Sequence, residues 1–196
     1  MGYLSHHENM THDWLLEDRA DQARDRLIDT AATLIRERGI DAFDINELAH
    51  RAHCSRATVY RHVGGKKHIV EAVLARSSVH VVDAVMTHTS HMRGSARSIT
   101  AIHVALQELR GDSVLRRLLQ SRQLPSIVPA ALGSPAVTRA AAELLGLDPD
   151  DDAGAQWAIR GFISLVLWPM TTDHEDAAID ALVAGLSRVT PTPSKV

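Results

Sequence analysis

The stretch that decides the fold is residues 44–67, DINELAHRAHCSRATVYRHVGGKK, in which two short helical segments follow each other closely. Asp44 stands directly before the first segment, and Glu47 comes three residues later, which resembles a capping box. A helix that starts there should run through Arg51 or Ala52. The pattern therefore predicts a short helix with a well-marked beginning.

A second helix is predicted at residues 56–62, because Ser55 can offer its hydroxyl to the free amides of a new first turn. Gly64 and Gly65 then end this helix. Only residues 52–54 remain between the two helices. A three-residue turn is the length that joins the helices of a DNA-binding helix-turn-helix.

The second short helix has two different sides. Val59 and Val63 lie four residues apart and should pack on Leu48 and Ala49 of the first helix. The opposite side consists of Arg56, Ala57, Tyr60 and Arg61, flanked by Thr58 and His62. Guanidinium groups, hydroxyls and a methyl group are what reading a DNA major groove requires. We expect Ser55 and these six residues to contact DNA.

Charge is concentrated in the same region. Residues 45–76 carry six Lys or Arg and two Glu, a local charge of +4, although the whole chain has a formal charge of −3. Lys66 stands where the next helix begins, so its ammonium and the free amides there suit a phosphate. One basic module on a mildly acidic body is the charge distribution of a nucleic-acid-binding protein.

Helical periodicity continues on both sides. Apolar residues recur at helical spacing from Arg19 to Arg38, and a long helix is predicted from Lys66 to about His91. Further helices are predicted at Ser95–Leu109, Ser113–Leu119, Pro135–Leu145, Asp152–Trp168 and His174–Val189. The proline- and glycine-containing stretch 121–135 reads as a loop. No segment alternates as a strand does, so the fold class is all-α.

The cysteine count, the length of the apolar stretches and the N-terminal sequence indicate in which compartment the protein is expected. Cys54 is the only cysteine, so no intrachain disulfide can form. The longest apolar stretch, near residues 159–170, is too short for a bilayer span, and the N-terminus does not read as a secretory signal. We expect a cytoplasmic protein without a membrane partner. Residues 1–17 read as a mobile arm and residues 191–196 as a frayed tail.

The region from about residue 20 to 75 resembles the N-terminal domain of TetR-type transcriptional regulators. The resemblance rests on a first helix, Gly39, a short helix, a turn, and then Ser55, Thr58, Tyr60, His62 and Lys66 in that order. It implies a helix-turn-helix domain at 18–65 and a larger helical domain at 66–190 that binds an effector and dimerises. It also implies a homodimeric repressor of a palindromic operator in double-stranded DNA, released by a small molecule, with no cofactor.

Four positions depart from the family pattern. His53 replaces the usual turn glycine and must tolerate or avoid a left-handed backbone. Asp44 caps as well as Ser or Thr but repels phosphate, so one contact to the DNA backbone is weakened. Val63 replaces an aromatic residue, and Lys67 replaces an acidic one, which makes this edge more basic.

The last two predicted helices each carry an apolar face. The faces consist of Ile159, Phe162, Ile163 and Val166, together with Ile179, Leu182, Val183 and Leu186. Two such helices and their copies can form a four-helix interface, which is the dimer that the family resemblance implies. The alternative is that both faces pack inside one monomer.

An effector pocket is expected in the C-terminal body, lined by residues that suit an apolar ligand. The candidates are Met86, Met92, His103, Trp157 and Arg160, the two polar ones being able to orient a ligand. The alternative is that these side chains fill the core or face solvent. His88, His91 and His103 lack an accompanying carboxylate or thiol at metal-site spacing, so no metal site is expected.

Two other classes of function are the alternatives to a DNA-binding regulator. The sequence shows no catalytic triad motif, phosphate-binding glycine loop or HExxH run, so an enzyme is not expected. A helical interaction protein with a merely solvated basic segment is the other alternative. Salt-dependent DNA binding separates it from a DNA-binding regulator.

Overall fold

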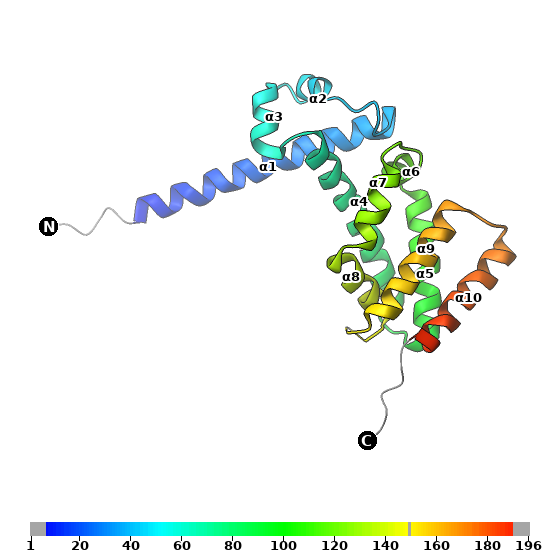
Figure 1. The fold of residues 1–196 in the computed structure, drawn as a ribbon. Coiled ribbons are helices and arrows are strands. Elements are labelled where there is room, and N and C mark those ends of the chain that lie inside the picture. The colour runs from blue at the N-terminus through cyan, green and yellow to red at the C-terminus, as the bar shows by residue number, and fades with distance from the viewer. Residues whose placement is uncertain (1–6, 149, 190–196) are drawn as a thin grey trace. The chain divides into compact units, whose positions relative to one another are not determined.

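The computed structural model describes residues 7–148 and 150–189, which form ten α-helices (Figure 1). Their bounds are α1 His7–Arg38, α2 Ile45–Arg51, α3 Arg56–Val63, α4 Lys66–Thr89, α5 Gly94–Gly111, α6 Ser113–Leu119, α7 Leu124–Leu132, α8 Pro135–Leu145, α9 Asp152–Leu167 and α10 Thr172–Val189. No strand occurs in this part of the chain. The all-α prediction is confirmed.

The chain divides into two compact units, Met1–Arg76 and Ser77–Val196. The division falls inside α4. The sequence pattern assigns all of this helix to the C-terminal domain, whereas its first part, Lys66–Arg76, belongs to the N-terminal unit in the structure. The first part of α4 belongs to the N-terminal unit because it contributes buried side chains. Ile69, Val70 and Val73 are each at most 3% exposed.

Helix α1 is longer than its periodic segment. It begins at His7, whereas the sequence pattern placed the start near Arg19. Residues 7–38 contain neither glycine nor proline, so no residue stops the helix from extending toward the N-terminus. Residues 1–6 lie outside the described residues, and the mobility of the predicted arm stays a prediction.

The prediction of a loop at residues 121–135 is wrong in its centre, because α7 occupies Leu124–Leu132. Pro125 lies in the first turn, where a backbone N–H has no partner within the helix, so proline is tolerated there. Pro129 lies inside the helix. At the end of α7, the side-chain amide of Gln156 donates to the Leu132 carbonyl over 2.9 Å.

The core of the N-terminal unit holds the helix-turn-helix on α1. Leu34, Ile35, Leu48, Val59 and Ile69 are at most 2% exposed and come from four different helices. Helix α1 packs against both α2 and α3. The short helices α2 and α3 therefore take their stability from α1 rather than from their own length.

The C-terminal unit has its own core, built mainly from α5, α8, α9 and α10. Helices α9 and α10 approach closely, because a Cβ on Gly161 would overlap the methyl groups of Leu182. Arg110 of α5 also donates two hydrogen bonds to Glu175 near the start of α10, at 2.8 and 2.6 Å. Over the described residues, no helix is long and apolar enough to cross a membrane.

Candidate nucleic-acid interface

The turn between α2 and α3 is a Schellman motif. Cys54 N–H donates to the Ala49 carbonyl over 3.0 Å, and His53 N–H donates to the His50 carbonyl over 3.2 Å. His53 has φ +51°, the left-handed conformation that usually favours glycine. His53 therefore adopts the left-handed conformation in place of the glycine usual in the family, and the turn keeps its geometry.

Ser55 begins α3 as predicted. Its Oγ accepts a hydrogen bond from the Thr58 N–H over 3.1 Å, and it lies 3.0 Å from the Thr58 hydroxyl. At the other end, Gly64 N–H donates to the Tyr60 carbonyl, and Gly64 has φ +81°. Both ends of this eight-residue helix are thus fixed by local hydrogen bonds.

Asp44 caps α2, but the capping box is not completed. Asp44 Oδ1 accepts from the Asn46 N–H over 3.0 Å, which lowers the pKa of Asp44; Arg56 and Lys66 lower it further. Glu47 instead forms ion pairs with Arg38 and Arg51. Asp44 is therefore a fixed negative charge that two basic side chains partly offset.

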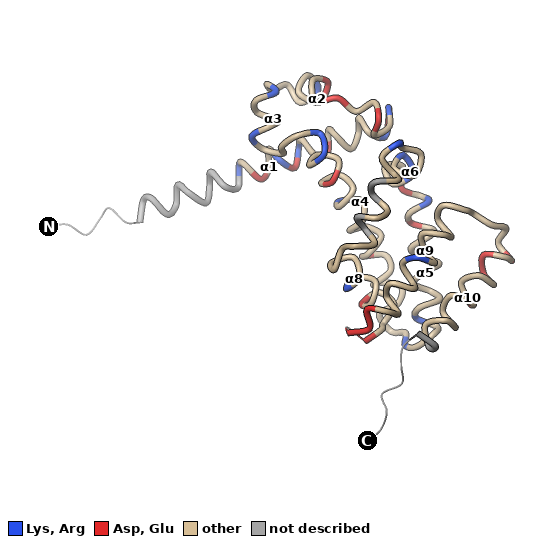
Figure 2. The backbone as a smooth tube through the Cα atoms, viewed as in Figure 1, with Lys and Arg blue, Asp and Glu red and all other residues tan. Residues whose placement is uncertain are grey.

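Helix α3 separates a buried side from an exposed side. Val59 is fully buried and Val63 is 9% exposed, whereas Tyr60 on the other side is 48% exposed. Arg56, Ala57 and Arg61 are exposed as well, and Thr58 and His62 are half-buried. Four of the predicted DNA-contacting residues of α3 are thus exposed, and Lys and Arg occur along α3 and at the start of α4 (Figure 2).

Lys66 has a role that the sequence did not indicate. Its Nζ donates to the carbonyl of Asp41 over 3.1 Å and so ties the start of α4 to the loop before α2. Two of the three N–H groups of the ammonium remain beyond this bond. Lys66 and Asp41 are 25 positions apart, and a local sequence pattern does not predict a contact over that separation.

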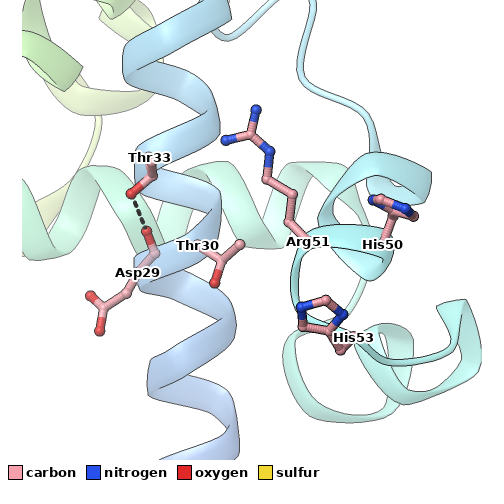
Figure 3. A pocket seen from close by; sticks show the side chains of 6 residues that line it. All are labelled: Asp29, Thr30, Thr33, His50, Arg51 and His53. Carbon is pink, nitrogen blue, oxygen red and sulfur yellow. Dashed lines mark hydrogen bonds between the residues drawn. The ribbon is translucent and has the colours of Figure 1, made fainter.

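A shallow hollow of about 500 Å³ lies between α1 and the end of α2 (Figure 3). Thr30 and Thr33 line one side, but each hydroxyl donates to a carbonyl of its own helix. Arg51 lines the other side and pairs with Glu37 over 2.7 Å, which lowers the pKa of Glu37. Thr30, Thr33 and Arg51 therefore serve the unit's own structure.

The exposed side of α3 can do what a recognition helix does. It presents two exposed guanidinium groups and an exposed phenol. Bidentate Arg contacts read guanine, and hydroxyls bind phosphates or base edges. A helix that lies in the major groove holds such groups in register with base pairs, and hydrogen bonds at both ends of α3 fix this helix.

The comparison with known families agrees with this geometry. Residues 27–73 match the family model described as bacterial regulatory proteins of the tetR family. The N-terminal unit of this chain is therefore a TetR-type DNA-binding domain. The chain is a DNA-binding transcriptional regulator, and regulators of this type are not enzymes.

Relatives resemble this chain in sequence beyond the matched region, and solved structures resemble it in fold. The uncharacterised HTH-type transcriptional regulator Rv1255c of Mycobacterium tuberculosis is 28% identical over 175 residues, which is 86% of this chain and 87% of the relative. The TetR-family repressor QsdR of R. erythropolis aligns with TM-score 0.60 at 22% identity, over 89% and 99% of the two chains. RolR in complex with resorcinol aligns with TM-score 0.61 at 20% identity, over 91% and 98%.

The structure places most of the predicted dimer residues inside the C-terminal core of the chain itself. Ile179 is fully buried, and Ile159, Val166, Leu182, Val183 and Leu186 are at most 9% exposed. Phe162 and Ile163 are half-buried. The predicted apolar faces thus pack within the protomer, which was the alternative for these side chains.

The predicted pocket residues do not gather into one cluster of contacts. Met86 and Met92 are half-buried, on α4 and just after it. His103 lies 3.7 Å from Asp176, joining α5 to α10. Trp157 is 45% exposed and donates to the Leu182 carbonyl, and Arg160 is exposed and bonds to Gln156 along α9. Their part in binding an effector stays a prediction.

Proposed function

We propose that this TetR-family regulator is a repressor that binds a palindromic operator as a homodimer and is released by a small, largely apolar effector. The observation that carries the proposal is α3, a short capped helix with a buried valine side and an exposed basic, aromatic side. A helix of this kind enters the major groove and reads base edges.

In this proposal, the α3 side chains have separate tasks. Arg56 and Tyr60 contact base edges, and the Ala57 methyl lies against a thymine methyl. Arg61 and His62 bind at the edge of the groove. Ser55, Thr58 and Lys66 bind phosphates and set the orientation of the helix.

Selection of bound sequences from random duplex DNA tests the operator. We expect a palindrome whose half-sites lie about 34 to 36 Å apart, because two copies of α3 must reach successive major grooves. Arg56→Ala and Tyr60→Ala should each weaken binding to this operator by about 1 to 3 kcal/mol without loss of helicity. Arg139→Ala removes an exposed charge from α8 and serves as the control. Unchanged operator binding by both α3 variants would contradict the assignment.

We propose that the dimer interface is formed by the exposed sides of α9 and α10, the two helices that the sequence pattern predicted for this role. This exposed α9/α10 face consists of Trp157, Arg160 and Ser164 of α9, Trp168 directly after α9, and Ala177, Ala181 and Ala184 of α10. Trp157 and Trp168 are 45% and 66% exposed, and large exposed aromatic groups are typical of interaction surfaces. Small alanine side chains beside them allow the helices of a second copy to approach closely.

A charged residue on this face tests the proposal without damaging the core. Ala181→Glu should give monomers in light scattering at micromolar concentration and lower the affinity for the palindromic operator. Ala136→Glu on exposed α8 is the matched control and should remain dimeric. A wild-type monomer, or an Ala181→Glu dimer, would contradict the proposed interface.

The effector proposal rests on the apolar inner faces of the C-terminal helices, which supply few charges to a ligand. RolR, which shares the fold, is seen with the small aromatic molecule resorcinol. A ligand releases DNA only if it binds the low-affinity conformation more tightly. Apolar or aromatic compounds should therefore raise the melting temperature and weaken operator binding together. A screen in which only highly charged compounds stabilise the protein would contradict this.

A further inference from the structure

Helix α4 contributes to both cores, but no apolar side chain in its middle is buried. Val73 is the last buried apolar residue of α4 in the N-terminal unit. Val85 is the first residue of α4 in the core cluster of the C-terminal unit. Between them, Val79 and Val82 are 54% and 37% exposed. The chain crosses from one unit to the other within this section, after Arg76.

Arg76 joins α4 to α1 at the place where this section begins. Its Nη2 lies 2.5 Å from Asp25 Oδ1, and its Nη1 lies 2.5 Å from Asp29 Oδ1. The two aspartates are four residues apart, so they occupy one side of α1. One planar guanidinium thus bridges two carboxylates of a helix that also packs against α3.

We propose that these two ion pairs form a lock that holds α4 on α1 and thereby keeps α3 in its DNA-binding position. Arg76 is then a positioning residue for operator binding, an inference that rests on the proposed operator. If the lock is broken, α1 and α4 can shift against each other, and α3 shifts with α1, on which it packs. The DNA-binding arrangement then loses a constraint, and fewer molecules adopt it.

Global stability is not the main role of this arginine. Arg76, Asp25 and Asp29 have side chains that are 36%, 64% and 69% exposed, and ion pairs this exposed contribute little to the free energy of unfolding. Their effect is on the direction of one helix. We expect the loss of both pairs to weaken operator binding by about 2- to 10-fold while the melting temperature changes little.

The decisive variant is Asp25→Asn with Asp29→Asn in the full-length protein. It removes two negative charges, so electrostatics alone would strengthen binding to DNA phosphates. The lock requires the opposite, a weaker complex with the selected operator. Arg76→Gln should weaken binding to a similar extent. Arg93→Gln loses the same charge in the C-terminal unit, where this arginine bonds to the carbonyls of Ser90 and Met92, and should bind like wild type.

Two further readouts separate the lock from other roles. If Arg76 contacted DNA itself, Arg76→Gln would lower the slope of log affinity against log salt by about one, whereas the lock leaves the slope unchanged. In the free protein, the Asp25→Asn/Asp29→Asn variant and Arg76→Gln should both exchange the amide hydrogens of residues 74–80 faster than wild type. This measurement needs no operator, so it tests the lock even if the proposed operator fails. Asn variants that bind as tightly as wild type, a lowered slope, or unchanged exchange would each overturn the proposal.

Discussion

The ion pair between Arg110 and Glu175 makes a quantitative prediction about the C-terminal unit. Arg110 Nη1 and Nη2 donate to the two carboxylate oxygens over 2.8 and 2.6 Å, and Nη2 also lies 3.2 Å from the Leu165 carbonyl. One side chain of α5 therefore holds the start of α10 and the end of α9. The exposed α9/α10 face depends on the position of both helices.

The expected coupling free energy between Arg110 and Glu175 follows from how exposed the two side chains are. The Glu175 side chain is only 14% exposed, so its carboxylate would be left without a partner if Arg110 were removed. Hydrogen bonds to charged groups contribute about 1.5 to 3 kcal/mol each. The Arg110 side chain is 36% exposed, and solvent screening reduces that figure. We expect a coupling free energy of about 1 to 2 kcal/mol between the two residues at pH 7.

The coupling should also depend on pH. Hydrogen bonding from Arg110 lowers the pKa of Glu175 below its ordinary value of 4.5 and raises the pKa of Arg110. Since the folded pKa of Glu175 is lower than the unfolded one, its contribution is complete above pH 4.5. That contribution is lost as the pH falls through the folded value.

A double-mutant cycle measures this coupling. Arg110→Gln, Glu175→Gln and the double variant are unfolded in urea at one protein concentration, at pH 7 and again near pH 4. In a Trp14→Phe background the tryptophan fluorescence comes from Trp157 and Trp168, both of the C-terminal unit. The single changes should not add, and the coupling should fall at the lower pH. Additive effects at pH 7, or a coupling that grows on acidification, would refute the reasoning.

Three further changes test other parts of the structure. His53→Gly should raise the free energy of unfolding by about 1 kcal/mol, because glycine carries no Cβ penalty at φ +51°, whereas His50→Gly inside α2 should lower it by a similar amount in thermal melts. Ser55→Ala removes the cap of α3 and should cost about 1 kcal/mol, and an unchanged urea midpoint would show that the cap contributes nothing. Gly161→Ala should destabilise the C-terminal unit by about 1 to 3 kcal/mol, because the new Cβ must displace the buried Leu182 side chain; a more stable variant would contradict the close packing of α9 and α10.

Sequence reasoning worked where the determining interactions are local. The caps at Asp44 and Ser55 and the two glycines after α3 act within a few residues, and they place α2 and α3 within about one residue of the structure. The same holds for α6 and α8, whose observed bounds equal the predicted ones. Proline in α7 misled the reading, because proline is counted as a breaker even where a first turn accepts it.

What the sequence left open depends on contacts between distant segments. The spacing of Ile179, Leu182 and Leu186 shows that one side of α10 is apolar, but it does not say whether the same chain or a second copy covers that side. The structure buries these residues within the protomer. Likewise, nothing near Arg76 in the sequence points to aspartates about 50 residues earlier, although the three side chains meet in space.

The division of α3 into two sides has an evolutionary consequence. Val59 and Val63 hold the helix on the unit, while Arg56, Tyr60 and Arg61 take no part in its core. Mutations at the outward positions therefore escape the selection that removes unstable proteins, because surface changes alter stability by only a few tenths of a kcal/mol. After a gene duplication, one copy can acquire a new target sequence by drift at a handful of codons. Diversity of targets among descendants of such a gene then requires no change of scaffold.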